Sequence, residues 1–260
     1  MDTSEASLSE AVQELGSTSK PSPADGRSRL TSRTKHLRWF ELCLVLLTSF
    51  GGPFFNSLNT LLVGHAIQLP PRVQTAEWAE SIVREAVCLL LLGYVLSRRK
   101  LRIRDFGLRL SVRDLVIGFA LAIISAGASY TAYRVGHSLT SVAHGALAST
   151  LAGGVTAKQL YSNSSLIVFP FTILNAFFEE LIVRAYLMTE IRELTGSWIL
   201  SVIASVVVQT SYHVHYGWIG ALSVALGFLV FSIYYARTRK ATPIIFAHAL
   251  IDLYSLSWLF

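Results

Sequence analysis

Long apolar segments, separated by short polar or basic connections, make up most of the chain from residue 39 onward. A transmembrane helix needs about 20 predominantly apolar residues to cross about 30 Å of hydrocarbon. The pattern therefore predicts an all-α fold, a polytopic membrane bundle of seven transmembrane helices with a site between its core helices. The predicted spans are approximately 39–63, 79–97, 113–133, 164–188, 198–214, 217–236 and 241–259.

The connection over residues 134–163 fits this pattern least well. It is rich in small residues and in Gly, Ser and Thr, and it could hold a short re-entrant or interfacial helix. An eighth crossing in this connection would invert the orientation of every later span. The span count is therefore seven, or eight if residues 134–163 also cross.

The chain divides into three regions by composition. Residues 1–36 form a polar and basic head rich in Ser, Thr and Pro, which we expect to be disordered because it has little apolar surface to bury. Residues 37–97 hold the N-terminal transmembrane helices. Residues 98–260 form the membrane core, which carries the ionisable residues discussed below.

Composition and charge support an integral membrane protein. The chain is 52% hydrophobic and 15% charged, which is too apolar for an ordinary soluble domain. The net charge of +6 does not indicate nucleic-acid binding, because the basic residues cluster in connections beside the spans. With seven spans, the basic clusters at 27–38, 98–113 and 237–240 lie on one side, as the positive-inside rule expects of a cytoplasmic N-terminus.

Three ionisable residues interrupt the fourth apolar segment: Glu179, Glu180 and Arg184. A charged residue near the bilayer centre costs roughly 2.5–3.5 kcal/mol on insertion scales, so such residues need a partner, water or a function. On an α-helix Glu180 and Arg184 share one face, and Glu179 lies about 100° round from Glu180. One carboxylate can therefore pair with the arginine while the other faces a water and acts as a general base.

Two later segments each carry a histidine. His213 lies near the end of the fifth predicted span, and His248 lies in the last one with Asp252 four residues later on the same face. A single Glu–Arg pair is often structural, and a lone histidine at a span end usually packs. However, five or six costly groups in three separate spans indicate a common purpose, and we interpret them as a hydrolase site within the bilayer.

These residues resemble the three motifs of the CAAX prenyl protease and bacteriocin-processing (CPBP, or Abi) family of intramembrane endopeptidases. The order and the spacing agree, and the resemblance covers residues 98–260. The motifs are Glu179-Glu180-x-x-x-Arg184, a helix ending in His213, and His248-x-x-x-Asp252.

The resemblance implies a role for each motif. Glu179 and His213 would activate the attacking water, and the Glu180–Arg184 pair would hold the geometry of the site. His248 and Asp252 would stabilise the oxyanion or bind the peptide. One position departs from the family pattern, because the second motif usually has Phe four residues before its His and this chain has Gln209.

The resemblance leaves two alternatives for the cofactor: the enzyme uses zinc, or it uses no cofactor. Family members have been described both as metalloproteases and as glutamate-dependent enzymes. Glu179, His213 and His248 could supply three zinc ligands and leave a fourth position for water. The chain lacks the His-Glu-x-x-His arrangement typical of zinc proteases, which favours a water activated by glutamate and histidine.

The expected partners are the lipid bilayer and a peptide or protein substrate at the membrane, with or without an attached lipid. We expect an integral protein of a bacterial cytoplasmic membrane. The alternative is a non-catalytic membrane scaffold or immunity-type protein that keeps the same fold, which a degenerate set of site residues would have favoured. A small transporter is a third hypothesis, but the chain has no internal repeat of the kind that transporter halves have.

Overall fold

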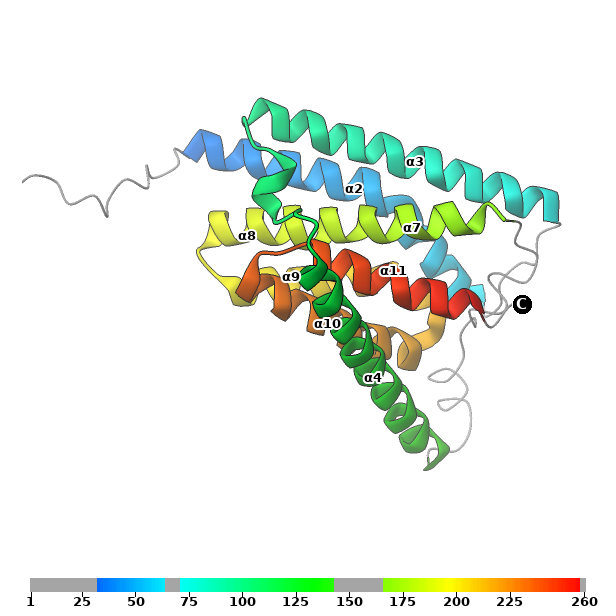
Figure 1. Cartoon of the computed structure of the whole chain (residues 1–260). Coiled ribbons are helices and arrows are strands. Elements are labelled where there is room, and N and C mark those ends of the chain that lie inside the picture. Colours follow the sequence, from blue (N-terminus) through cyan, green and yellow to red (C-terminus); the bar gives the residue numbers. More distant parts are fainter. Residues whose placement is uncertain (1–31, 64–70, 143–165, 258–260) are drawn as a thin grey trace, which may run out of the picture. The chain divides into compact units, whose positions relative to one another are not determined.

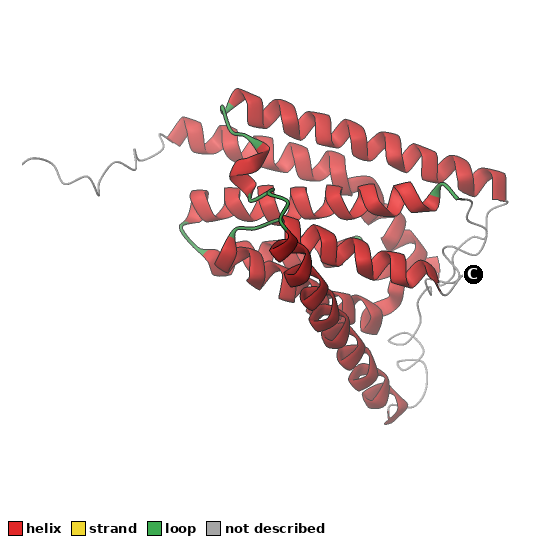
Figure 2. Ribbon diagram, in the orientation of Figure 1, coloured by secondary structure: helices red, strands yellow, loops and turns green. Residues whose placement is uncertain are grey.

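The computed structural model describes residues 32–63, 71–142 and 166–257, and all regular elements in these ranges are helices (Figures 1 and 2). The predicted all-α fold class is therefore confirmed for the part of the chain that the structure describes. The chain divides into two units, residues 1–37 and residues 38–260, and the packing described below is that of the second unit.

The described elements follow one another along the chain in this order. The elements are α2 (Ser32–Val63), α3 (Pro71–Arg98), the 3-10 turn η2 (Ile103–Phe106), α4 (Val112–Val142), α7 (Val168–Glu179), the π-helix η3 (Glu180–Leu187), α8 (Met188–Thr195), α9 (Trp198–Ser211), the 3-10 turn η4 (Val214–Tyr216), α10 (Gly217–Thr238) and α11 (Thr242–Ser257).

Each of the seven predicted apolar segments contains a helix. By length and composition, three helices among the described residues could cross a membrane: Thr34–Val63, Val112–Thr140 and Val214–Thr238. By contrast, α9 has 14 residues and α11 has 16, which is shorter than a typical span. An integral membrane bundle is thus supported, and the count of seven crossings stays a prediction.

Two boundaries differ from those predicted. α2 begins at Ser32, before the expected end of the polar head at residue 36, and residues 1–31 lie outside the described residues. α4 continues to Val142, so the first part of the 134–163 connection is a continuation of this helix. Residues 143–165, where a re-entrant or interfacial helix was considered, also lie outside the described residues.

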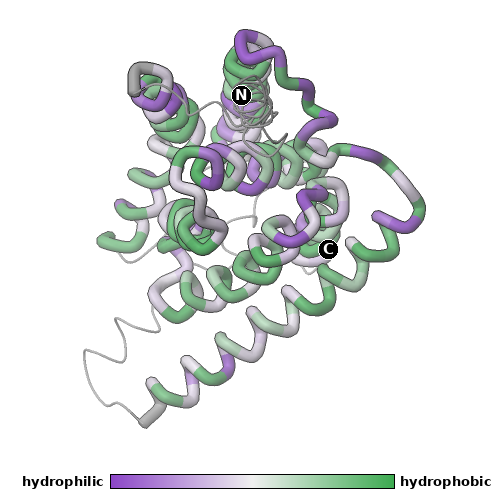
Figure 3. The backbone as a smooth tube through the Cα atoms, turned by 90° about the vertical axis from the view of Figure 1, so that its left-hand side faces the viewer, coloured by the Kyte–Doolittle hydropathy of each residue, from purple (hydrophilic) through white to green (hydrophobic). Residues whose placement is uncertain are grey.

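The surface of α4 indicates contact with lipid. Val116, Phe119, Ile123 and Ile124 are each more than half exposed, with exposed fractions of 56–64%. Figure 3 shows mainly hydrophobic residues along α4 and hydrophilic residues in the connection between α3 and α4. A row of large exposed apolar side chains is unfavourable in water, and lipid tails would cover it.

α4 packs against α10 and α11, α7 packs against α3 and α11, and α8 packs against α9. α4 approaches α10 closely at Gly227 and approaches α11 closely at Gly118. At Gly227 on α10, the backbone carbonyl accepts a hydrogen bond from the Ser125 hydroxyl of α4 at 3.0 Å. At Gly118 on α4, an added Cβ would lie 2.7 Å from the Pro243 carbonyl oxygen at the start of α11. This packing brings α4, α10 and α11 around one cavity.

An ion cluster joins α2, the end of α3 and α8. Arg38 donates to Glu190 at 2.9 Å and to Glu193 at 2.6 Å, and the Arg99 guanidinium bonds Glu41 and lies 2.6 Å from Glu190. Burial alone would lower the pKa of Arg99, but its hydrogen bonds to Glu190 and Glu41 outweigh burial and raise that pKa. The cluster therefore fastens the N-terminal helices to α8 at one end of the second unit.

Candidate active site

The glutamate pair lies where α7 passes without a break into the π-helix η3. π-helical segments are rare and occur frequently at functional sites. Glu180 Oε1 lies 3.2 Å from Arg184 Nη1, and both side chains are fully buried. The predicted Glu180–Arg184 pair is therefore present. The sequence predicted an α-helix throughout this segment. That prediction is wrong for Glu180–Leu187, which form a π-helix with more residues in each turn.

Glu179 is held from two sides. The Asn175 amide, one turn earlier on α7, donates to Glu179 Oε1 at 3.2 Å. The Gln209 amide of α9 donates to the other oxygen, Oε2. The carbonyl oxygen of the same Gln209 side chain accepts a hydrogen bond from Arg184 Nη1. Gln209 thus connects the arginine of the first motif to the carboxylate of Glu179.

His248 lies between two carboxylates. Its Nδ1 is 2.8 Å from Glu180 Oε1, and its Nε2 is 3.5 Å from Asp252 Oδ2. The first distance is that of a good hydrogen bond, and the second is at the limit of one. Glu180 therefore fixes the ring by accepting from Nδ1, and in the imidazolium form the Nε2–H group keeps the freedom to donate to another oxygen.

His213 lies in the turn between α9 and α10, two residues beyond the end of α9 at Ser211. Its Nδ1 is 2.8 Å from the backbone carbonyl oxygen of Gln209, an acceptor, so Nδ1 carries the proton. The neutral ring then has an unprotonated Nε2, which can accept a proton.

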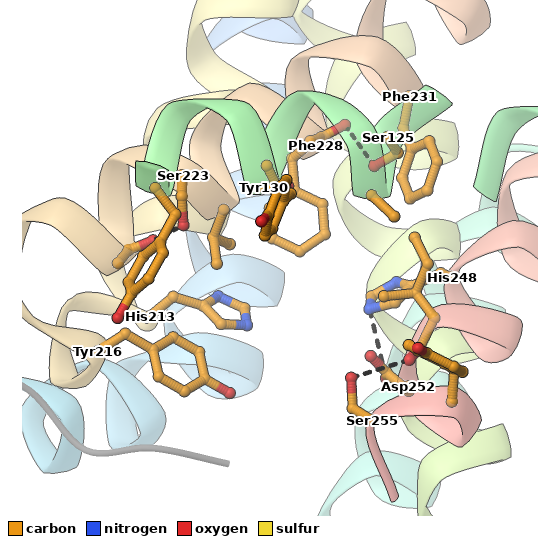
Figure 4. Close-up of a pocket in the computed structure, with 18 of the residues that line it drawn as sticks. Ser125, Tyr130, His213, Tyr216, Ser223, Phe228, Phe231, His248, Asp252 and Ser255 are labelled. Atoms are coloured by element: carbon orange, nitrogen blue, oxygen red, sulfur yellow. Dashed lines mark hydrogen bonds and ion pairs between the residues drawn. The ribbon is translucent and has the colours of Figure 1, made fainter. Parts of the chain in front are cut away.

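A cavity of about 610 Å³ separates the two histidines. Figure 4 shows His213 and Tyr216 on one side of it, and His248, Asp252 and Ser255 on the other. Asn175 also lines this cavity, whereas the three residues of the first motif lie behind its wall. Glu179 and Glu180 adjoin it through their hydrogen-bond partners Asn175 and His248. The structure thus brings all six predicted residues into one region, with three of them on the cavity surface.

The sequence reasoning missed two polar partners of Glu179. Asn175 precedes Glu179 by four residues, and this spacing on a helix was a usable signal. Gln209 was noted only as a departure from the family motif, and its contact with Glu179 across 30 positions of the chain has no local signal. The Gln209 contact depends on how α9 packs against the helix that carries the first motif.

The predicted zinc ligands do not fit a metal site in this arrangement. Among the described residues, no group of three or more His, Cys, Asp or Glu side chains could hold a metal ion. His213 and His248 stand on opposite sides of the cavity, and both oxygens of Glu179 accept hydrogen bonds from amides. Zinc binding by these residues stays a prediction, and we derive no step that uses a metal.

Fold and site together define an α-helical membrane protein with buried carboxylates and histidines around a cavity. Residues 161–254 match a family model described as type II CAAX prenyl endopeptidase, Rce1-like. The matched range includes all three motifs, and the resemblance to the CAAX prenyl protease family is therefore confirmed over these residues. No curated protein and no solved structure matches the chain.

Proposed function

We propose that the protein is an intramembrane endopeptidase that hydrolyses a peptide bond of a membrane-associated protein or peptide with a water activated by Glu179 and His213. The observation that carries this proposal is the cavity of about 610 Å³ between His213 and His248, with buried carboxylates directly behind its wall. The carboxylates and histidines of the site lie within residues 161–254, which match the endopeptidase family, and this supports the same reaction.

His213 is suited to take a proton from the attacking water. The Gln209 carbonyl fixes the tautomer with the proton on Nδ1, so Nε2 can accept. Glu179 adjoins the cavity beside Asn175, and each carboxylate oxygen can accept a second hydrogen bond, so Oε1 can also accept from the attacking water. In free enzymes such catalytic hydrogen bonds are often long or poorly aligned, and they tighten when substrate binds.

His248 is suited to stabilise the oxyanion of the tetrahedral intermediate. Glu180 holds its Nδ1, and the 3.5 Å distance from Nε2 to Asp252 allows the Nε2 proton to be shared with a substrate oxygen. Arg184 compensates the charge of Glu180 and so keeps the buried carboxylate in place. Asp252 stands at the cavity surface, where it can also bind a backbone N–H of the peptide.

The proposed substrate is a peptide or protein held at the membrane, and the proposed location is a bacterial cytoplasmic membrane with the N-terminus in the cytoplasm. Apolar rings and hydroxyl groups share the cavity wall, including Phe228, Phe231, Tyr130 and Ser223. This mixed lining suits an extended peptide segment, whose backbone needs hydrogen-bond partners. Whether the substrate carries an attached lipid is tested below by comparing prenylated and unprenylated peptides.

Cleavage of fluorogenic peptides, prenylated and unprenylated, by the purified protein in liposomes tests this function. Wild type, Glu179→Gln and His213→Ala are compared with the matched control His137→Ala, which alters a histidine of α4 outside the cavity. We expect cleavage by wild type and the control, and its loss in both site variants. Activity retained by either site variant would remove that residue from the mechanism. No cleavage of any peptide by wild type would favour the scaffold hypothesis.

Adding a zinc chelator to each reaction tests the metal hypothesis separately. We expect the wild-type rate to stay unchanged, because the side chains do not form a zinc site. Loss of activity with the chelator, and its return on adding zinc, would instead assign Glu179, His213 and His248 as ligands.

A further inference from the structure

We propose that Gln209 is a positioning residue that orients both members of the water-activating pair, Glu179 through its side chain and His213 through its backbone carbonyl. The inference rests on the proposed function of that pair. It concerns the one position at which the chain departs from the motif of the family.

Gln209 belongs to a polar row on one face of α9. Ser201, Ser205 and Gln209 follow one another at intervals of four residues, and all three are fully buried. Ser205 bonds Ser232 of α10 at 3.0 Å. This face therefore points into the bundle, and Gln209 is the member of the row that reaches the glutamate pair.

The orientation of the Gln209 amide is determined by the charges around it. Its NH₂ group donates to Glu179, and its carbonyl oxygen accepts from Arg184. The flipped amide would place NH₂ against a guanidinium, which can only donate, and oxygen against a carboxylate, which accepts when ionised. One arrangement is thus far more stable than the other.

Few other contacts could replace Gln209. Within the described part of the chain, Arg184 Nε and Nη2 have no hydrogen-bond partner, and its guanidinium stacks on Phe228 at 4.7 Å. Without the amide, Arg184 would keep only Glu180 as a hydrogen-bonding partner. Glu179 would keep Asn175, a residue of its own helix, and the neighbouring Tyr212 hydroxyl. An apolar residue at position 209 would therefore free the carboxylate to rotate.

Gln209 also determines the tautomer and the orientation of the His213 ring. The Gln209 backbone oxygen accepts the Nδ1 proton of His213, which fixes the tautomer and directs Nε2 to the cavity. Side chain and backbone of one residue therefore hold the two groups that act on the water. Because Gln209 does not line the cavity, it should affect the rate of the chemical step more than substrate binding.

The test compares Gln209→Met, which keeps the approximate volume and loses both side-chain hydrogen bonds, with wild type in the liposome cleavage assay. A hydrogen bond to a charged group is worth enough to change a rate roughly 10- to 100-fold. We expect kcat per folded protein to fall by about that factor, with KM within about twofold. We also expect the shape of the kcat–pH profile to change, because the carboxylate loses a charge-assisted hydrogen bond.

Ser205→Ala is the matched control, since it removes a buried hydrogen bond one turn earlier on the same face. Its pH profile should superimpose on that of wild type, whereas a change common to both variants would indicate a purely structural effect. Gln209→Glu keeps the acceptor for Arg184 and places a carboxylate against Glu179, so its profile should also move. If Gln209→Met does not fold, Gln209→Glu and Gln209→Asn decide the question by the same readouts.

Glu179→Gln, measured in parallel, separates this inference from the proposed function. If Glu179→Gln is active, the proposed role of Glu179 fails whatever Gln209 does. If Glu179→Gln is inactive while Gln209→Met keeps the wild-type kcat and pH profile, the proposed function stands and the positioning role of Gln209 is overturned.

Discussion

Asn175 is the one partner of Glu179 that also lines the cavity. Replacing it with Leu removes the donor on Oε1 and places an apolar side chain at the cavity surface. We expect kcat to fall roughly 10-fold, by the loss of one charge-assisted hydrogen bond, and KM to rise as well because the lining changes. Steady-state cleavage kinetics measure both constants. An unchanged KM would show that substrate does not approach Asn175.

Glu179 and Glu180 are neighbours with different tasks, and substitution should separate them. Glu180 is fully buried and faces both Arg184 and His248. Removing one partner of a buried pair leaves an uncompensated charge, which costs roughly 3–5 kcal/mol. We therefore expect Glu180→Gln to lower the thermal unfolding temperature, as followed by circular dichroism in detergent. Glu179→Gln should unfold near the wild-type temperature, and equal losses in the two variants would contradict this division.

At the scale of the element, η3 determines how the first motif faces its neighbours. Deleting Val183, within the π-helix, would allow this segment to return to α-helical hydrogen bonding. With one residue removed, Glu180 and Arg184 would be three residues apart instead of four, and Glu179 and Arg184 four instead of five. We expect cleavage to be lost, because the contacts of Glu179, Glu180 and Arg184 depend on their present spacing. A deletion variant that folds and cleaves at the wild-type rate would show that the π-helix has no such role.

Apolar periodicity and length were sufficient to predict the helices, since α4 and α10 consist almost wholly of apolar and small residues. The spacing of four residues also predicted that Glu180 would meet Arg184. The π-helix could not be predicted, because Ile182 and Val183 suit an α-helix in an apolar environment equally well. The contact of Gln209 with Glu179 depends on how α9 packs, and no local pattern carries that information.

At the scale of the whole molecule, the ion cluster around Glu190 connects α2 and the end of α3 to α8. Of these elements, α8 belongs to the region that matches the endopeptidase family. Glu190 is almost fully buried and pairs with two arginines. We expect Glu190→Gln to destabilise the folded state by roughly 1.5–3 kcal/mol, because both arginines lose a hydrogen bond to a shared carboxylate while Arg38 keeps Glu193 and Arg99 keeps Glu41. Faster hydrogen exchange in α2 and α3 would follow.

The exposed Glu77 on α3 provides the control for this experiment. Glu77→Gln makes the same substitution on α3, one of the two helices whose exchange is followed, and should leave exchange in α2 unchanged. Protection of α2 and α3 that is identical in Glu190→Gln and wild type would mean that apolar packing alone holds these helices.

The ion cluster also has a consequence for the substrate. Glu190 and Glu179 are eleven residues apart on the continuous α7–η3–α8 helix, a distance of about 15 Å. With the cluster at the membrane surface, Glu179 lies near the middle of about 30 Å of hydrocarbon. A peptide at that depth normally satisfies its backbone by forming a helix, whose carbonyl groups are already hydrogen-bonded. In the proposed reaction, the bond attacked would therefore lie in a segment that unwinds easily, and we expect glycine or proline near the scissile bond to make a membrane peptide a better substrate.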